Sequence, residues 1–315
     1  MISKNKVPIL VIAYRRHDIL RRLLDCLPND RHIYICVDGP CIPAHEQDVD
    51  LVRNLVDEFL RQNHFCAVLI REENFGGPIG IPMAIDWAFE HEDEICILEE
   101  DCIPTHLAFT YIDRIFPFLH GSEIVAGATL NNFIAARFGR KFDSPFLSIY
   151  GHIWGWAITK NAWFMLRPSP EIISSLRFQI SRKALKEMLY RKLPGDFFAQ
   201  LYWRRIFESI LDGSRYHWDY AFLLRLWCSD LYFVAPPCNL VSNIGFDERS
   251  ENCKIKSLNH ELPVATSDNL SDCLALKRLP DLNYFYQDFD KFNQLTVFNS
   301  GFFHEIKRNV RLLIS

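Results

Sequence analysis

Apolar runs alternate with apolar positions at helical spacing along the first 130 or so residues of the chain. Continuous apolar runs are typical of strands that are buried on both faces of a sheet. The predicted strands are 7–13, 32–37, 67–70, 95–98 and 123–128, and the predicted helices between them are 19–27, 49–59, 81–89 and 109–119. Because strands and helices alternate at this pace, we expect right-handed crossovers and an α/β fold with a mixed, mostly parallel sheet flanked by helices.

The alternation weakens after residue 128. A helix is predicted from Asp219 to Trp227 and a late strand at 231–235. Residues 171–192 carry six basic side chains interleaved with apolar ones, which predicts a basic amphipathic helix. Such a helix can lie on anionic lipid or bind an acidic acceptor, and an ordinary solvated helix face has the same pattern.

Composition indicates a compact globular protein. The chain has 315 residues, of which 49% are apolar and 14% aromatic, and its net charge of -4 gives no general attraction to nucleic acid. Its ten cysteines include no C-x-x-C pair, so we expect buried thiols of a reducing compartment, not a zinc site or a disulfide framework. The sequence shows no signal peptide before Val7 and no apolar run of about 20 residues, so we expect a cytoplasmic protein. Peripheral contact with a membrane stays open.

Acidic side chains follow the apolar run 95–98 directly, as Glu99, Glu100 and Asp101. Three adjacent carboxylates repel one another, so a strand end that keeps them usually offers them to a cation, although a solvated turn has the same composition. Ligands of open α/β sheets lie beyond the carboxyl ends of the strands. Since 13–16 and Asp38 occupy two further strand ends, the sequence predicts one ligand crevice at this edge.

Three other segments have both a functional and a purely structural interpretation. The glycine-rich segment 75–80 lacks the known phosphate-binding spacings, and a tight loop is the more natural interpretation. Aromatic residues between glycines at 150–156 suit either a wall for a sugar-like ligand or a core strand. Asp219 would lie in the first turn of its helix, where the helix dipole favours a carboxylate, so simple capping explains it equally well.

Several of these motifs resemble those of a known family. The run 8–13 with Arg16, Val37 to Gly39, and Ile97 to Pro104 resemble the nucleotide-sugar half of the glycosyltransferase A fold, as in animal N-acetylglucosaminyltransferase I. The second half resembles bacterial nucleotide-diphospho-sugar transferases of surface polysaccharide synthesis in three further segments, which are 152–157, 218–220 and 239–246. The resemblance spans about residues 7–250. It implies a nucleotide-sugar-binding half at 1–128, an acceptor-binding and catalytic-base half at 129–250, and a C-terminal extension at 251–315.

The resemblance also implies roles for single residues. Asp101 matches the last acid of a DXD-like motif, which ligates Mn2+ or Mg2+ on the diphosphate, and Asp219 matches the general base. The residues expected to contact the nucleotide sugar are Ala13, Arg16, Asp38, Glu99 and Glu100, and those expected to contact the acceptor are His152, Trp154 and Trp156. The chain departs from the family in having Glu-Glu-Asp where Glu-Asp-Asp is usual, and Gly-Pro-Ile in the glycine-rich segment.

The expected activity is therefore that of an inverting, metal-dependent hexosyl- or N-acetylhexosaminyltransferase. The resemblance favours a UDP-sugar donor and a glycan or glycolipid acceptor. A nucleotidyltransferase of sugar phosphates would use a similar acidic sheet edge, although no lysine-rich glycine loop occurs near residue 14. A catalytically silent glycan-binding protein is the third interpretation.

Overall fold

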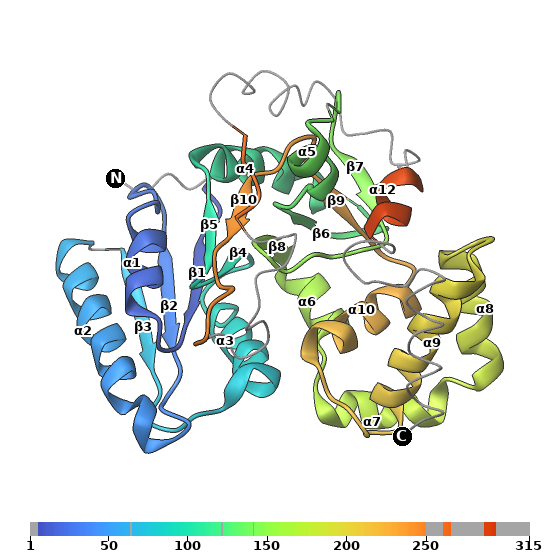
Figure 1. Ribbon diagram of the computed structural model, residues 1–315, viewed down its shortest axis with the longest axis horizontal. Coiled ribbons are helices and arrows are strands. Elements are labelled where there is room, and N and C mark those ends of the chain that lie inside the picture. Colours follow the sequence, from blue (N-terminus) through green and yellow to red (C-terminus); the bar gives the residue numbers. More distant parts are fainter. Residues whose placement is uncertain are drawn as a thin grey trace.

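The computed structural model describes residues 6–63, 65–120, 122–140, 142–249, 261–265 and 287–293. Most of the predicted extension at 251–315 therefore lies outside the described residues. Strands from both predicted halves join one eight-stranded sheet, with helices on both of its faces (Figure 1).

The sheet is mixed, as the sequence predicts. Its strand order is β3-β2-β1-β4-β8-β6-β9-β7, and four of its seven pairings are parallel. The strands are β1 Ile9–Ala13, β2 Ile33–Val37, β3 Cys66–Ile70, β4 Glu94–Glu99, β6 Val125–Thr129, β7 Phe146–Ser148, β8 Trp156–Thr159 and β9 Tyr232–Ala235. A second, antiparallel pair joins β5 (Cys102–Pro104) to β10 (Val241–Asn243), so that β10 lies beside the end of β4.

Alternate residues of the strands face two separate cores. In β1, Ile9 and Val11 pack with α1 (His17–Leu24), α2 (Glu46–Gln62) and α4 (His106–Leu119). Leu10 points to the other face and packs with α3 (Ile81–Ala88) and the helices of the second half. Both faces of these strands are thus covered, which explains why their sequences are continuously apolar.

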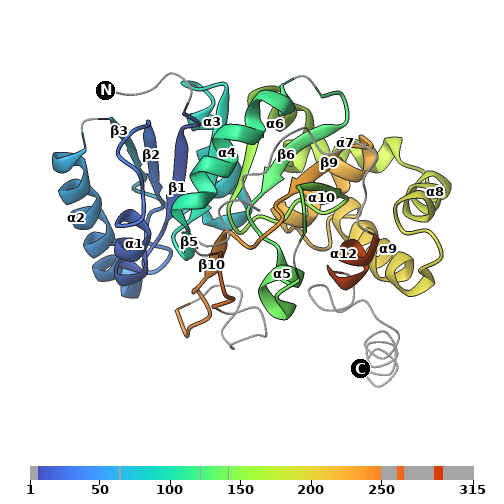
Figure 2. The ribbon, with the colours of Figure 1, turned by 90° about the horizontal axis from the view of Figure 1, so that it is seen from above.

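The second half is richer in helices than its sequence pattern indicates. The helices are α5 Phe133–Phe138, α6 Lys160–Leu166, α7 Pro170–Gln179, α8 Arg182–Lys192, α9 Phe197–Leu211 and α10 Trp218–Cys228, with a short α12 at Gln287–Phe292. The prediction of one basic helix in 171–192 is wrong, because the segment forms two helices. Helix α7 ends at Gln179, and Ser181 caps α8 by accepting from the N–H of Ala184. Helix α9 was not predicted at all. Seen from above, α7, α8 and α9 lie at the end of the molecule opposite α1 and α2 (Figure 2).

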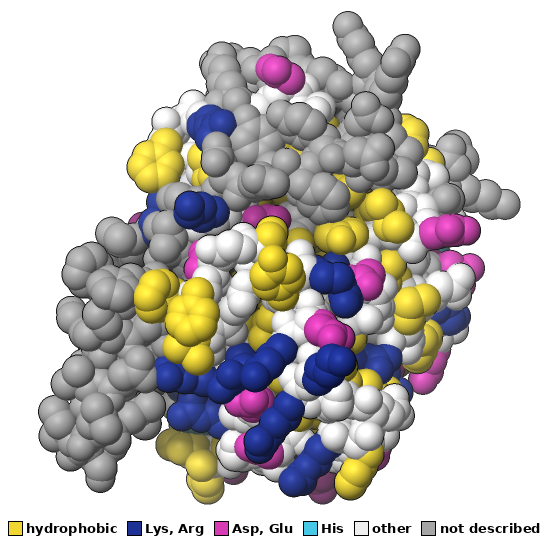
Figure 3. Space-filling view, turned by 90° about the vertical axis from the view of Figure 1, so that its right-hand side faces the viewer, with side chains coloured by type: hydrophobic (Ala, Val, Ile, Leu, Met, Phe, Trp, Pro, Cys, Tyr) yellow, Lys and Arg dark blue, Asp and Glu magenta, His cyan; other side chains and the backbone are white. Residues whose placement is uncertain are grey.

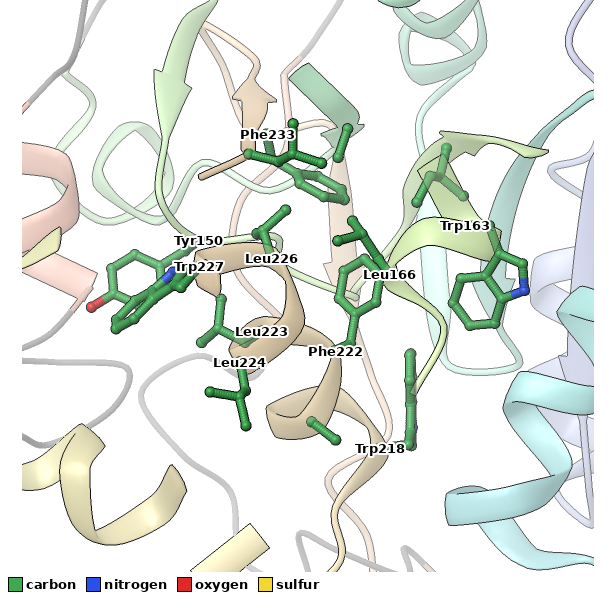
Figure 4. Packing of buried hydrophobic residues seen from close by; sticks show 14 of the residues in the cluster. Tyr150, Trp163, Leu166, Trp218, Phe222, Leu223, Leu224, Leu226, Trp227 and Phe233 are labelled. Carbon is green, nitrogen blue, oxygen red and sulfur yellow. The ribbon is translucent and has the colours of Figure 1, made fainter. Parts of the chain in front are cut away.

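An aromatic core joins α10 to the sheet. Trp218 and Phe222 of α10 lie close to Trp156 of β8, with ring centroids 6.3 and 5.4 Å away, and Phe222 stacks on Trp163 at 6.0 Å. Figure 4 shows Trp218, Phe222 and Trp163 gathered between α10 and its neighbours. Because large rings with few rotamers fill this space, the first turn of α10 is held at a fixed position against β8.

The described residues bear on two expectations drawn from composition, which concern membrane-spanning segments and cysteines. Within the described residues, no helix is long and apolar enough to cross a membrane. Seven cysteines of the described part of the chain are free thiols, as expected, but Cys238 is disulfide-bonded, which the expectation of thiols alone did not include.

Candidate functional site

The register of the sheet brings three strand ends to one edge. Ala13 of β1 pairs with Val37 of β2, and Ile12 of β1 pairs with Glu99 of β4. The residues that follow, 14–16, Asp38 and 100–101, therefore leave the sheet side by side. This is the convergence that the sequence predicts from the carboxyl ends of parallel strands.

Arg16 holds two of the three adjacent acids. Its Nε donates to Glu100 Oε1 at 2.6 Å and its Nη2 donates to Asp101 Oδ2 at 2.8 Å. The backbone N–H of Tyr14 donates to the other oxygen of Glu100 at 2.7 Å. Glu100 is nearly buried, so these charge-assisted bonds offset much of the cost of removing it from water. Arg16 was expected to contact the donor, and in this structure its guanidinium holds the carboxylates of Glu100 and Asp101 in place.

Gly245 lets the chain after β10 approach this ion pair. Arg16 Nη1 donates to the carbonyl of Gly245 at 3.1 Å. A Cβ at position 245 would lie 1.9 Å from Asp101 Oδ2 and 2.7 Å from Arg16 Nη1, so only glycine fits between them. The Asn243 side chain reaches Asp101 Oδ1 at a longer 3.4 Å.

Asp38 is tied to the glycine-rich segment. Its carboxylate accepts from the N–H of Phe75 at 3.1 Å and of Gly76 at 2.8 Å, and it lies 3.6 Å from Nη1 of Arg71. Gly76–Gly80 forms a π-helical turn that leads directly into α3, and the buried Arg71 donates to the carbonyl of Gly80 at 3.0 Å. The N–H groups of Phe75 and Gly76, at the start of this turn, are thus used by Asp38, so they are not available to a phosphate. The nucleoside contact expected of Asp38 stays a prediction.

Asp219 lies in the first turn of α10, and its charge acts on Glu99. The N–H of Tyr220 donates to its carboxylate, and burial raises its pKa above the ordinary value for aspartate. Burial also raises the pKa of Glu99, as do the charges of Asp101, Asp219 and Glu100, while Arg16 opposes them. Both side chains keep partial exposure. Trp156, which pairs with Ile97 of β4, has its ring 6.3 Å from that of Trp218, so the start of α10 lies near the end of β4.

The three residues expected to bind the acceptor lie in different surroundings. Trp156 is 1% exposed and packs inside the aromatic core, so it positions Trp218 and has no surface to offer a ligand. His152 is nearly buried beside Phe133, with ring centroids 5.0 Å apart, and burial lowers its pKa to about 4, which keeps its ring neutral. Trp154 is partly exposed, between the rings of Phe133 and Phe246. Of the three, Trp154 fits an acceptor wall best.

A divalent cation fits this edge only if the protein and a bound ligand coordinate it together. Within the described part of the chain, no group of three or more His, Cys, Asp and Glu side chains is arranged to hold a metal ion by itself. Asp101 Oδ2 is occupied by Arg16, whereas its Oδ1 has only two long contacts, 3.4 Å from Asn243 and 3.5 Å from Cys102. One carboxylate oxygen with the rest of the shell from phosphates and water is a common arrangement for Mg2+. Asp101 therefore suits a metal that arrives with a diphosphate.

Several residues of the site were not predicted. Arg71, Gly245 and Asn243 each contact a predicted residue. Gly245 and Asn243 lie in the segment 239–246, whose resemblance was noted without a role for either residue. Tyr14 lies in the predicted strand end 13–16, and its hydroxyl bonds His45 Nδ1 at 2.7 Å and accepts from the N–H of Cys41 at 3.0 Å. For Arg71 the available signal was its charge directly after a strand.

Comparison with known proteins gives a likeness of fold. No protein-family model and no curated protein matches the chain by sequence. Among solved structures, it is similar to the mannosyltransferase PcManGT from Pyrobaculum calidifontis, solved in complex with GDP-Man and Mn2+, with a TM-score of 0.38 and 11% identity over 71% of this chain and 73% of that one. It is also similar to the glycosyltransferase GlyE of Streptococcus pneumoniae TIGR4, with a TM-score of 0.29 and 12% identity over 67% of this chain and 44% of that one.

Both of these proteins are glycosyltransferases, the class that the sequence motifs resemble. With TM-scores below 0.5 and so few identical residues, neither likeness bears on what this chain binds or transfers. The chemistry has to be argued from the sheet edge itself.

Proposed function

We propose that this chain is a glycosyltransferase that moves a sugar from a nucleotide diphosphate to a hydroxyl group of a glycan or glycolipid, with inversion at the anomeric carbon. The observation that carries the proposal is that the start of α10 lies near the acidic end of β4. Trp156 pairs with Ile97 of β4, and its ring lies 6.3 Å from that of Trp218, the residue before Asp219. We assign the acidic end of β4 to the donor and Asp219 to the acceptor.

The charge balance of the edge supports a nucleotide diphosphate donor with a cation. Glu99, Glu100 and Asp101 are adjacent at this edge, and the guanidinium of Arg16 bonds Glu100 and Asp101. A diphosphate adds further negative charge, so its approach to this edge requires a divalent cation. When bound, the cation supplies Lewis-acid stabilisation of the leaving phosphate, and Asp101 Oδ1 is the protein atom we assign to it.

The remaining steps belong to side chains of this chain. Asp219 accepts the proton of the acceptor hydroxyl while the hydroxyl oxygen forms its bond to the anomeric carbon and the bond to the diphosphate breaks. Because burial raises its pKa, Asp219 is a stronger base than an ordinary aspartate. Glu99 and Glu100 lie between the cation position and Asp219 in our assignment, where the donor sugar would be held. Trp154 is the acceptor contact that we retain.

Donor binding tests this proposal directly. We expect Mn2+ together with one nucleotide sugar to raise the melting temperature, and a screen of UDP-, GDP- and other sugar nucleotides identifies the base and the sugar. The variant Asp101→Asn should lose the metal-dependent part of donor affinity in calorimetry. The matched control is Asp113→Asn, whose carboxylate is held by Arg31 and Lys6 and accepts from the N–H of Val7, at the opposite end of β1. Unchanged affinity in Asp101→Asn would remove Asp101 from the metal site, and no response to any sugar nucleotide would favour the silent-protein interpretation.

A further inference from the structure

The outward face of α8 combines positive charge with exposed aromatic rings. Its buried side, Leu185, Met188 and Leu189, packs into the core of the second half. Its outer side carries residues that repeat every four positions. We define the α8 face by six exposed residues, which are Phe178, Arg182, Lys183, Lys186, Tyr190 and Phe197.

Two of the three basic side chains of the α8 face form no ion pair with the described residues. Among the residues that the structure describes, Arg182 and Lys186 form no salt bridge, and Lys183 pairs only with Glu187 at 3.8 Å, where both side chains are well exposed. Figure 3 looks onto this side of the molecule and shows Lys and Arg side chains gathered in its lower half, with fewer acidic ones among them. Their charge is therefore available to an anionic partner.

Aromatic rings stand at both ends of α8. Phe178, just before the helix, is 88% exposed, and Tyr190 and Phe197, near its end, are each 66% exposed. Single exposed apolar residues are ordinary, but packing among the described residues does not explain three exposed rings near one basic helix. Aromatic rings next to Lys and Arg are typical of surfaces that lie at a bilayer interface.

We propose that the α8 face docks on a membrane surface that contains anionic lipids. Arg182, Lys183 and Lys186 attract the phosphate groups, and the rings of Phe178 and Phe197 enter the headgroup region. An acidic polysaccharide would satisfy the cations, but phenylalanine rings have no hydrogen-bonding group and favour an apolar phase.

The docked face belongs to the same helical part of the molecule as the candidate base. Helix α8 packs on α9 and α10, and α10 begins with the turn that carries Asp219. If the proposed function holds, docking places the enzyme at the bilayer, where a glycolipid acceptor resides. The docking itself requires neither a donor nor an acceptor, so it is tested independently of catalysis.

Vesicle co-sedimentation of the full chain tests the docking. We expect binding to vesicles of phosphatidylcholine mixed with phosphatidylglycerol, little binding to phosphatidylcholine alone, and weaker binding at high salt. Each basic residue near an anionic surface contributes about 1 kcal/mol, so Arg182→Gln with Lys186→Gln should weaken binding about 30-fold. The variant Phe178→Ser with Phe197→Ser should weaken it as well, but by an amount that salt does not change.

The matched control neutralises two exposed arginines at the opposite end of the molecule, with Arg22→Gln on α1 and Arg61→Gln on α2. Like Arg182 and Lys186, these two form no ion pair with the described residues, so both variants change net charge equally and break no contact. The control should bind vesicles as the unmodified protein does. Equal losses in both double variants, or no binding to anionic vesicles at all, would overturn the proposal. If heparin, a soluble acidic polysaccharide, binds at this face while vesicles do not, the face serves a glycan and the membrane proposal is wrong.

Discussion

Replacing Asp219 with asparagine is the sharpest test of the proposed chemistry. Asparagine has nearly the same shape, and its oxygen can still accept from the N–H of Tyr220 in the first turn of α10. Trp218, which fixes this turn against Trp156, is untouched. The substitution therefore removes a charge and a proton acceptor without removing a structural contact.

The expected loss is in turnover. A positioned general base contributes about 100-fold to 10,000-fold, so kcat should fall by a factor in that range while the donor dissociation constant changes little. The pH profile gives a second result. Unmodified protein needs Asp219 ionised, so its rate falls as the pH drops through the raised pKa of this carboxyl, and in Asp219→Asn this acidic limb should disappear.

The same substitution has an electrostatic effect that does not depend on turnover. The charge of Asp219 contributes to the raised pKa of Glu99, so removing it should lower that pKa. NMR titration of the glutamate carboxyls measures this shift in the absence of donor and acceptor. It therefore reports whether the two side chains share a site even if the transfer reaction has not been identified.

The assay follows sugar transfer with purified protein and the donor found in the thermal-shift screen, and NMR of the product gives its anomeric configuration. Asp212→Asn is the matched control, because this exposed aspartate at the end of α9 also accepts from a backbone N–H and lies seven residues before Asp219. A fully active Asp219→Asn enzyme would refute the base assignment, and Asp247 and Glu248 would be tested next. A product with the anomeric configuration of the donor would refute the single-base mechanism.

Two further substitutions probe the scaffold around the site. Gly245→Ala should push Asp101 away from Arg16, and because a hydrogen bond to a charged group is then lost, the free energy of unfolding in urea titrations should fall by about 1.5–3 kcal/mol. The control is Gly77→Ala, whose added methyl group meets nothing closer than 3.7 Å. Equal effects of the two substitutions would contradict the close approach of Gly245 to Asp101. Asp290 of α12 accepts from the Ser148 hydroxyl at 2.6 Å, and burial raises its pKa to about 7. Because the folded-state pKa of Asp290 exceeds the ordinary value of 3.8, the stability that Asp290 contributes is present below pH 4 and is lost as the pH rises toward 7. If α12 detaches only when the whole protein unfolds, the loss in the free energy of unfolding is roughly 4 kcal/mol. Asp290→Asn should remove this pH dependence, and a variant with the original pH dependence would show that another group titrates.

The first half of the fold could be predicted because its signals are local. Each strand of the parallel part is covered on both faces, so its sequence is a continuous apolar run, and each crossover helix has one apolar side. The confirmed elements include β1, β2, β4, α2 and α3, with ends within a few residues of the prediction. The convergence of Arg16, Asp38 and Asp101 follows from parallel topology alone, and the register of the strands confirms it.

The second half could not be predicted in the same way, because its helices pack on one another as well as on the sheet. Helix α9 carries Tyr202, Trp203 and Phe207, whose rings fill an aromatic core shared with α10. With apolar residues on several sides, its sequence lacks the single stripe that marks an amphipathic helix. The prediction for Trp156 was wrong for a related reason. A tryptophan beside a glycine suits a ligand wall and a core equally, and only its burial distinguishes the two.

The acidic triplet shows how a correct physical premise can lead to an incomplete conclusion. Three adjacent carboxylates do require a positive partner, and the sequence suggested a metal ion, but the chain supplies Arg16 for two of them. In the described part of the chain Arg16 bonds neither Glu99 nor Asp219, and burial raises the pKa values of both. A protein selected only for stability would gain by replacing such residues, since each buried charge without a partner costs free energy. Under the proposed function, a cation and a diphosphate complete this site beside Asp101 Oδ1.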